Sequence, residues 1–374
     1  MFNRPLLSLV LLTVIAAGLS PTAFAMDIGG ELELQAGVRH TDSWTTDLQG
    51  QVLLELYLPE TPPFSTRFAA EGFLGSEQSD WRFKYLYLRW QGDNGQVTVG
   101  RQPVAWGYGS MLNPLGYGID IQGLAGQSVV PAVDGIRYVH SLGSGRRLEL
   151  VVDLPEGLTE QGLETLGYGG RLRWPKLGQD LSFNISSQPM FLPLGPDGAV
   201  VRERLLRTGV TYRGDAGPIG LYGALGYVRL LEAEEHDILL QVGLDTSWQW
   251  GSEYQSRPVI LQAEYLRFMH SRLYPGLLLQ WNPEQLEQDA AEEHTPEAVA
   301  VNDLLLLNLV VEWDYFTQFG AALMMPVGPG PKTLAPYYVT DLGGDVQLRL
   351  QGDITRLEAG AFHYGVRAGL TKHF

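Results

Sequence analysis

The sequence predicts an all-β protein, a transmembrane antiparallel up-and-down β-barrel of about 16 strands. Apolar and polar residues alternate in segments of about ten residues, near the length that a tilted membrane strand needs. Short glycine-rich turns separate some segments and longer loops separate others, as in outer-membrane barrels. A water-soluble antiparallel sandwich would also alternate, but the segment length, the loop pattern and the aromatic residues near segment ends favour the barrel.

The first residues predict export. Arg4 precedes an apolar stretch over Leu6–Gly18, and Ala23-Phe24-Ala25 matches the small-x-small pattern of a cleavage site. The apolar stretch is shorter than the roughly 20 residues of a membrane-spanning helix. We therefore expect a Sec signal peptide over residues 1–25, cleaved after Ala25, and a barrel over residues 26–374. An uncleaved N-terminal anchor is the alternative.

The first segment shows the alternation clearly. Leu32, Leu34, Ala36 and Val38 share one face of a strand, and Glu31, Glu33, Gln35 and Arg39 share the other. The same pattern returns over residues 48–58, 147–154, 181–186, 238–250 and 345–351, and weaker candidates follow over 64–74, 82–90, 169–174, 206–213, 219–229, 259–268, 303–315 and 319–325. The candidates number 14 to 18, and the count should be even if both termini are periplasmic. A barrel of about 16 strands leaves an aqueous lumen.

Composition excludes several functions. The chain has no cysteine, so it has neither disulfides nor a cysteine-based metal or redox site. Its net charge of −16 argues against binding nucleic acid, whose phosphates need a basic surface. His140-Ser141 and His270-Ser271 are adjacent pairs, and neighbours in a strand face opposite sides, so neither forms a nucleophile and base. We expect no enzyme activity, cofactor or metal site.

The C-terminal segment resembles the terminal strand that outer-membrane barrels present to their assembly machinery. Residues 365–374 alternate and end on Phe374. Lys372 departs from the usual pattern, because an aromatic residue is common two positions before the end. This resemblance implies the barrel-assembly machinery as a partner, with outer-membrane lipid and lipopolysaccharide around the wall.

One loop carries the most information about function. The segment Gln96–Gln102 is expected to be the fifth strand, and the loop Pro103–Ala132 after it is rich in Gly, Pro and aromatic residues. General porins fold the loop after their fifth strand into the lumen, where irregular backbone is shielded from lipid. By this resemblance, the residues expected to narrow the pore are Arg101, Trp106, Tyr108, Tyr117 and Asp120. The alternative is an external loop that caps the barrel mouth.

The same region resembles a pattern in poorly characterised Gram-negative outer-membrane barrels. The matching residues are Val99-Gly100-Arg101-Gln102, Trp106-Gly107, Asn113-Pro114 and Val133-Asp134-Gly135-Ile136-Arg137. The chain departs from the pattern twice, since no Asp follows Asn-Pro at the expected position and Val133-Asp134-Gly135 permutes a Gly-Val-Asp run. The resemblance covers roughly 40 residues and implies fold and location, with porin-like function or help to an envelope exporter.

Charged residues occupy the inward positions of many predicted strands. The lumen-facing candidates are Arg39, Glu55, Arg137, Arg147, Glu149, Arg171, Arg173, Arg207, Asp245 and Arg349. Rings of charge in a lumen select ions by sign, and paired charges on a solvated wall are the alternative. Because acids outnumber bases in the chain, the sequence favours a preference for cations.

These observations predict a porin-like channel of the Gram-negative outer membrane for passive diffusion of small hydrophilic solutes or ions. Two alternatives stay open. The barrel could assist the export of a hydrophobic substrate, which a lateral opening or a plugged lumen would indicate, or it could sheathe a partner protein. The sheathed partner would then be a periplasmic electron carrier or an exporter subunit. Separately, the barrel could form a homo-oligomer, as porins commonly do.

Overall fold

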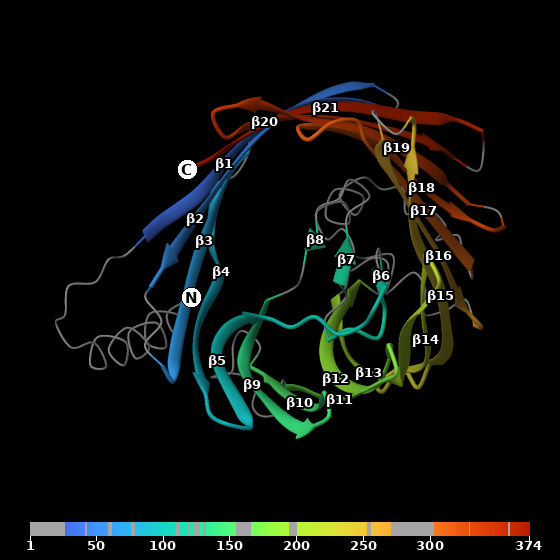
Figure 1. Cartoon of the computed structure of the whole chain (residues 1–374). Coiled ribbons are helices and arrows are strands. Elements are labelled where there is room, and N and C mark those ends of the chain that lie inside the picture. The colour runs from blue at the N-terminus through green and yellow to red at the C-terminus, as the bar shows by residue number, and fades with distance from the viewer. Residues whose placement is uncertain are drawn as a thin grey trace.

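The computed structural model is one closed antiparallel barrel, viewed nearly along its axis in Figure 1. It describes residues 27–374 except 42, 59–61, 76–78, 110–111, 118–119, 123–127, 130–131, 155–165, 194–199, 253–255, 271–302, 329 and 358–359. The barrel has 18 strands, so the predicted fold class is confirmed; the count lies at the upper end of the predicted range of 14 to 18, two more than the favoured number of 16. No helix in the described parts of the chain is long and apolar enough to cross a membrane.

The barrel strands follow one another around the ring in chain order. They are β1 (Asp27–His40), β2 (Trp44–Tyr57), β3 (Phe64–Leu74), β4 (Ser79–Gln91), β5 (Gly95–Pro103), β9 (Ala132–Gly143), β10 (Arg146–Asp153), β11 (Gly167–Lys176), β12 (Gln179–Pro193), β13 (Val200–Ala216), β14 (Ile219–Leu230), β15 (His236–Trp250), β16 (Arg257–Phe268), β17 (Asp303–Glu312), β18 (Thr317–Pro326), β19 (Lys332–Gly343), β20 (Val346–Arg356) and β21 (Phe362–His373). Each pairs with the strand before it and the strand after it, so a ring of hydrogen bonds satisfies the backbone as a lipid environment requires.

The first and last strands close the ring. β1 pairs with β2 on one side and with β21 on the other. Gly30 and Phe374 exchange two backbone hydrogen bonds, of 2.9 and 3.1 Å. Lys372, which departs from the usual terminal pattern, donates a hydrogen bond to the carbonyl of Gly344 and lies 3.6 Å from the carboxylate of Asp345. The lysine thereby ties the last strand to the neighbouring β19–β20 turn.

Alternation along each strand separates a lipid-facing surface from the lumen. In β14, Leu221 and Leu225 are exposed on the outer face, whereas Tyr222, Ala224 and Val228 are buried on the inner face. Exposed large apolar side chains recur on the outer face of the other strands, including Trp81, Trp90, Trp174, Trp248 and Trp250 near strand ends. An apolar outer band with aromatic residues at its borders is typical of membrane barrels.

The connections differ between the two ends of the barrel. Tight turns over 92–94, 144–145, 177–178, 217–218 and 344–345 lie at the end of the barrel where β1 begins and β21 ends. Positive backbone φ angles at Gly145 (77°) and Gly178 (77°) show why glycine suits two of these turns. The long connection over residues 104–131 leaves from the opposite end.

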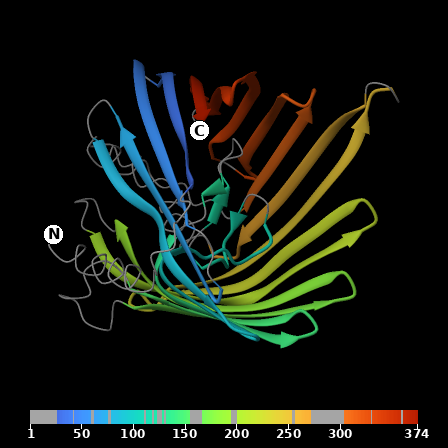
Figure 2. The ribbon, with the colours of Figure 1, turned by 60° about the vertical axis from the view of Figure 1, so that its left-hand side comes forward.

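That long connection folds into the barrel. It contains a small separate sheet of β6 (Leu112–Asn113), β7 (Asp120–Gln122) and β8 (Ser128–Val129). Figure 1 shows this sheet inside the ring of strands, and the turned view of Figure 2 shows it between the two ends of the wall. The structure therefore confirms an inward-folded loop after the fifth strand, and the external capping loop is excluded. We call residues 104–131 the inward loop.

Candidate functional site

The inward loop is held first by an aromatic anchor. Trp106 donates a hydrogen bond of 2.7 Å from Nε1 to Oε1 of Glu149 on β10. Arg137 on β9 donates from Nε to the same carboxylate oxygen, also over 2.7 Å. The Trp106 ring meets the Tyr117 ring edge to face, with centroids 5.1 Å apart. One buried carboxylate on the wall thus binds both the loop and a neighbouring strand.

Two glycines of β11 make room for this aromatic pair. A Cβ added at Gly169 would lie 2.8 Å from the Tyr117 ring and 2.9 Å from the Trp106 ring. A Cβ at Gly167 would lie 2.9 Å from the Tyr117 hydroxyl. Carbon atoms do not approach rings this closely, so glycine at these inward positions creates the notch that the rings fill. Trp106 and Tyr117 are 1% and 0% exposed as a result.

A second anchor lies farther along the loop, on β13 and β14. The Leu115 side chain occupies a slot between Gly209 and Gly226, where an added Cβ would come within 2.6 and 2.5 Å of it. Leu115 joins an apolar cluster of inward residues, which includes Leu205, Ala224, Val228, Leu230, Leu239, Leu266, Phe268, Leu304 and Leu306. The guanidinium of Arg207 donates to the carbonyl of Pro114 over 3.4 Å. The loop therefore spans from β10 to β14 along the inner wall.

The loop also has an internal scaffold. Asn113 accepts a hydrogen bond of 2.7 Å from the backbone N–H of Gly109 and donates one of 3.1 Å to the carbonyl of the same residue. Gly107 has a φ of 112°, and a Cβ there would lie 2.4 Å from the Asn113 side chain. These contacts give a physical role to the Trp-Gly and Asn-Pro residues of the sequence pattern, because they shape the loop.

Tyr108 lies between the two anchors. The guanidinium of Arg171 on β11 stands over the Tyr108 ring, 5.2 Å from its centroid, as in cation–π pairs. Burial raises the pKa of the Tyr108 hydroxyl, and burial together with the charge of Asp153 raises the pKa of Tyr117. Both hydroxyls are therefore neutral across the physiological pH range.

The five residues expected to narrow the pore take different places. Trp106, Tyr108 and Tyr117 lie on the inward loop, the first and third as buried anchors. Arg101 lies on the wall, at the end of β5, in an ion pair of 2.6 Å with Asp134 of β9. Asp120 belongs to β7 and pairs through its backbone with Asn113, and its side chain lies outside the described residues. Which of them limits the diameter stays a prediction.

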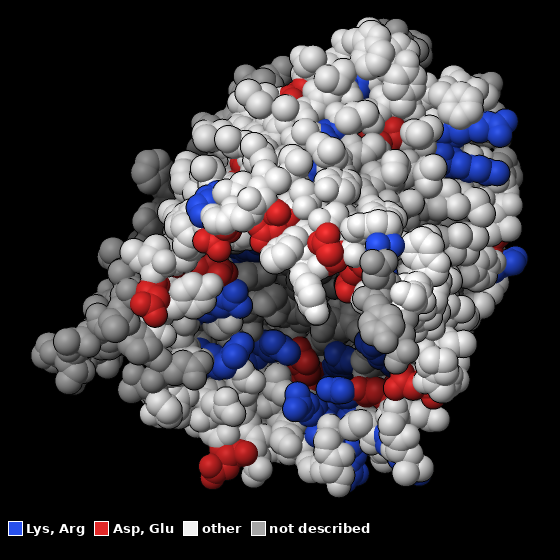
Figure 3. Space-filling model, turned by 45° about the horizontal axis from the view of Figure 1, so that its top comes forward, with Lys and Arg blue, Asp and Glu red and all other residues white. Residues whose placement is uncertain are grey.

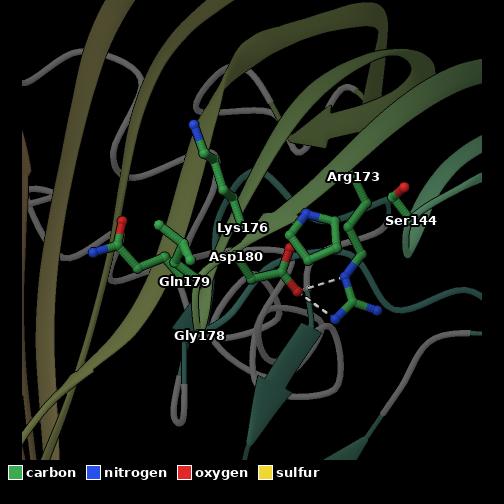
Figure 4. Close-up of a pocket in the computed structure, with 8 residues that line it drawn as sticks. Ser144, Arg173, Lys176, Gly178, Gln179 and Asp180 are labelled. Carbon is green, nitrogen blue, oxygen red and sulfur yellow. Dashed lines mark hydrogen bonds and ion pairs between the residues drawn. The ribbon is translucent and has the colours of Figure 1, made fainter.

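Several predicted lumen charges form ion pairs on the wall. Glu55 pairs with Arg67 over 2.9 Å, Arg137 pairs with Glu149, and Arg173 pairs with Asp180. Figure 4 shows this last pair at an open pocket of about 340 Å³ beside the β11–β12 turn.

The other predicted lumen charges have no ion pair among the described residues. Arg39 and Arg147 are exposed, Arg207 is buried, and Asp245 and Arg349 occupy inward positions of β15 and β20.

The two signs of charge tend to occupy different sides of the opening. In Figure 3 the molecule is hollowed, with Lys and Arg predominating along the lower border of the hollow and Asp and Glu predominating along the upper border. Inward arginines concentrate on β9–β13. Arg147 lies opposite Arg173, and Arg171, Arg173 and Arg207 lie opposite the small polar residues Asn184, Ser182 and Ser186. Arg137 lies opposite Thr98 and Val151, and among the described residues the one acid in this register is Glu149, opposite Arg171. Such an arrangement produces an electric field across the lumen.

Sequence reasoning missed the residues that hold the loop. Glu149 was expected to be a charge that lines the lumen, and its role as hydrogen-bond acceptor for Trp106 was not predicted. The four glycines that make room for the anchors were not identified either. A signal existed in the sequence, because Gly167, Gly169, Gly209 and Gly226 occupy inward positions of β11, β13 and β14. A strand with glycine on one face marks a site where another group approaches closely.

No protein-family model matches the chain, and no curated protein matches its sequence. Solved structures do match over nearly its whole length. OccAB1 of Acinetobacter baumannii has a TM-score of 0.56 at 8% identity, covering 93% of this chain and 96% of that chain. OccK2 (OpdF) of Pseudomonas aeruginosa, solved in complex with glucuronate, has a TM-score of 0.54 at 9% identity, covering 94% and 96%. OpdQ of the same organism has a TM-score of 0.54 at 10% identity, covering 93% and 98%.

The chain has the fold of the outer-membrane porins. At this level of identity the likeness concerns the fold, so solute and selectivity must come from the residues of this chain.

Proposed function

We propose that the protein is a passive, porin-like channel of a Gram-negative outer membrane for small hydrophilic solutes and ions. The observation that carries the proposal is a closed 18-stranded wall with charged side chains inside and a loop anchored inside the lumen, along the inner face of β10–β14. A barrel of this size encloses more space than side chains fill, and the loop narrows that space without closing the wall.

In this mechanism the wall and the loop have separate tasks. The apolar outer face holds the barrel in lipid, while the inward charges keep the lumen hydrated and discriminate between ions by sign. The two anchors keep the loop at a fixed height, because Trp106, Leu115 and Tyr117 are all buried against the wall. Solutes then pass beside the loop through the part of the lumen that it leaves open.

The location and the partners follow from the same proposal. Residues 1–25 lie outside the described residues, and a signal peptide cleaved after Ala25 would deliver the chain to the periplasm. Insertion would use the barrel-assembly machinery and the terminal strand that ends on Phe374, and lipid and lipopolysaccharide would surround the outer face. Each of the 18 strands pairs on both sides, which argues against the lateral opening that export of a hydrophobic substrate would need.

Planar-bilayer recording of the refolded mature chain tests the proposal. We expect steady, reproducible openings in symmetric salt and a defined reversal potential under a salt gradient. A panel of uncharged sugars of increasing size, added to one side, would then measure the width of the passage. A folded, heat-modifiable barrel that conducts no current would contradict the proposal and would favour a barrel that works only with a partner protein.

A further inference from the structure

Arg207 on β13 is a buried cation without a carboxylate partner in the part of the chain that the structure describes. It is 2% exposed, and no Asp or Glu among the described residues lies within ion-pair distance of it. The other arginines that face the same part of the lumen are either paired with an acid or reached by solvent. Burial of a lone charge is costly, so a buried guanidinium normally has an anion beside it.

The described neighbours of Arg207 carry no negative charge. Cross-strand register places Ser186 on one side and the apolar Val228 on the other. The guanidinium donates to the amide oxygen of Gln188 and, at 3.4 Å, to the carbonyl of Pro114, and both acceptors are uncharged. Only part of the five-donor capacity of an arginine is used.

Two buried polar atoms at this place have no hydrogen-bond partner among the described residues. One is Nε of Arg207, and the other is the hydroxyl of Tyr117, which is 0% exposed. The amide of Gln188 accepts from Arg207 and also lies beside the Tyr117 oxygen, so the two side chains meet at the junction of loop and wall. A guanidinium Nε–H with an adjacent Nη–H forms the fork that takes a carboxylate or a halide.

We infer that Arg207, with Tyr117 beside it, forms a binding site for a small monovalent anion between the inward loop and the wall. The anion accepts hydrogen bonds from Nε of Arg207 and from the Tyr117 hydroxyl, and it supplies the negative charge that the wall lacks. Either a free halide or the carboxylate of a small solute has the required chemistry. Because Arg207 also holds Pro114, an anion there stabilises the second anchor of the loop.

Bromide tests the site directly. Crystals of the mature barrel in bromide should show an anomalous peak beside Nε of Arg207, and acetate should remove that peak if the site also accepts carboxylates. A peak that acetate leaves unchanged identifies a halide site, which supports the inference with the free ion as its source. Absence of any peak at Arg207 overturns the inference.

Thermal unfolding in detergent gives a second readout. At constant ionic strength, bromide should raise the melting temperature of the wild-type barrel by several degrees relative to the bulky gluconate anion. Arg207→Met should abolish this difference, whereas Arg213→Met, an exposed arginine on the same strand, should retain it. If Arg207→Met does not fold, Arg207→Lys keeps the charge but removes Nε and should lose the bromide effect. An equal bromide effect in the Arg207 variants and in wild type contradicts the site. Binding does not require conduction, so failure here leaves the channel proposal standing.

Discussion

A single methyl group placed in the β11 notch should displace the inward loop. In Gly169→Ala, the new Cβ would lie 2.8 Å from the Tyr117 ring and 2.9 Å from the Trp106 ring. Ordinary contacts of this kind begin near 3.5 Å, so the two rings must retreat by more than half an ångström. Overpacking of this kind costs about 1–3 kcal/mol, and the wall strand cannot move away without breaking its ladders to β10 and β12.

The cost falls on the docked position of the loop. Since every 1.4 kcal/mol changes an equilibrium tenfold, the ratio of docked to displaced loop should fall by about 5- to 150-fold. Single-channel recording should then show frequent excursions to a second conductance level and greater current noise in the open state. The fold should be retained, because the substitution adds a strand-compatible residue in the lumen.

Gly170→Ala is the matched control. Gly170 is the next residue of the same strand and faces outward, and a Cβ there would lie 3.4 Å from the Leu150 side chain, an ordinary contact. The control should conduct like wild type. If Gly169→Ala and Gly170→Ala give the same conductance levels and the same noise, the aromatic anchor does not position the loop, and the reasoning is refuted.

Three further variants test other contacts. Glu149→Gln keeps the shape of the side chain but removes the negative charge to which Trp106 and Arg137 donate. It should cost about 1.5–3 kcal/mol for each weakened charged hydrogen bond and so lower the melting temperature of the barrel. An unchanged melting temperature would show that the shared carboxylate does not stabilise the barrel. Arg171→Glu reverses an inward charge beside the loop and should shift the reversal potential toward cations without unfolding the barrel, whereas a fixed reversal potential would place Arg171 away from the conduction path. Deletion of Phe374 removes two backbone hydrogen bonds to Gly30 and should slow insertion by the assembly machinery. The fraction of heat-modifiable barrel measured over time reports the insertion rate, and insertion at the wild-type rate would exclude a role for the terminal residue.

Strand periodicity predicted most of the wall because the two faces of each strand meet different solvents. The alternation over residues 31–39 or 238–250 arises because one face of the strand contacts lipid and the other contacts water. It can therefore be recognised in the sequence without knowing which strands are neighbours. The favoured number of 16 is two below the observed 18, partly because β19 was not among the predicted strands. Pro336 stands in its middle, where a central strand normally excludes proline.

The structure shows how β19 tolerates this proline. Pro336 pairs with Ala321 of β18, while the ladder to β20 is interrupted between the pairs Leu334–Ile354 and Tyr337–Gln351. Gly352 lies opposite the interruption, and a Cβ there would come 3.2 Å from the proline ring. A glycine on the neighbouring strand therefore provides the space that the proline ring needs, and this pairing is visible only once the strand order is known.

The inward loop was predictable as a segment, but its anchors were not, and the reason lies in the distance between partners along the chain. Trp106 and Glu149 are 43 residues apart, and Arg207 lies 93 residues from Pro114. The two-residue period of a strand places Glu149 and Arg207 on the lumen side, where both were expected. The period does not show whether a charge on that side contacts solvent or the loop. The observed burial distinguishes the two cases. Glu149 and Arg207 are buried and hold the loop against the wall, whereas Arg147 is exposed and can contact a solute in the lumen. The net charge of the chain is therefore a poor guide to selectivity, because the charges that count are those that the loop leaves uncovered.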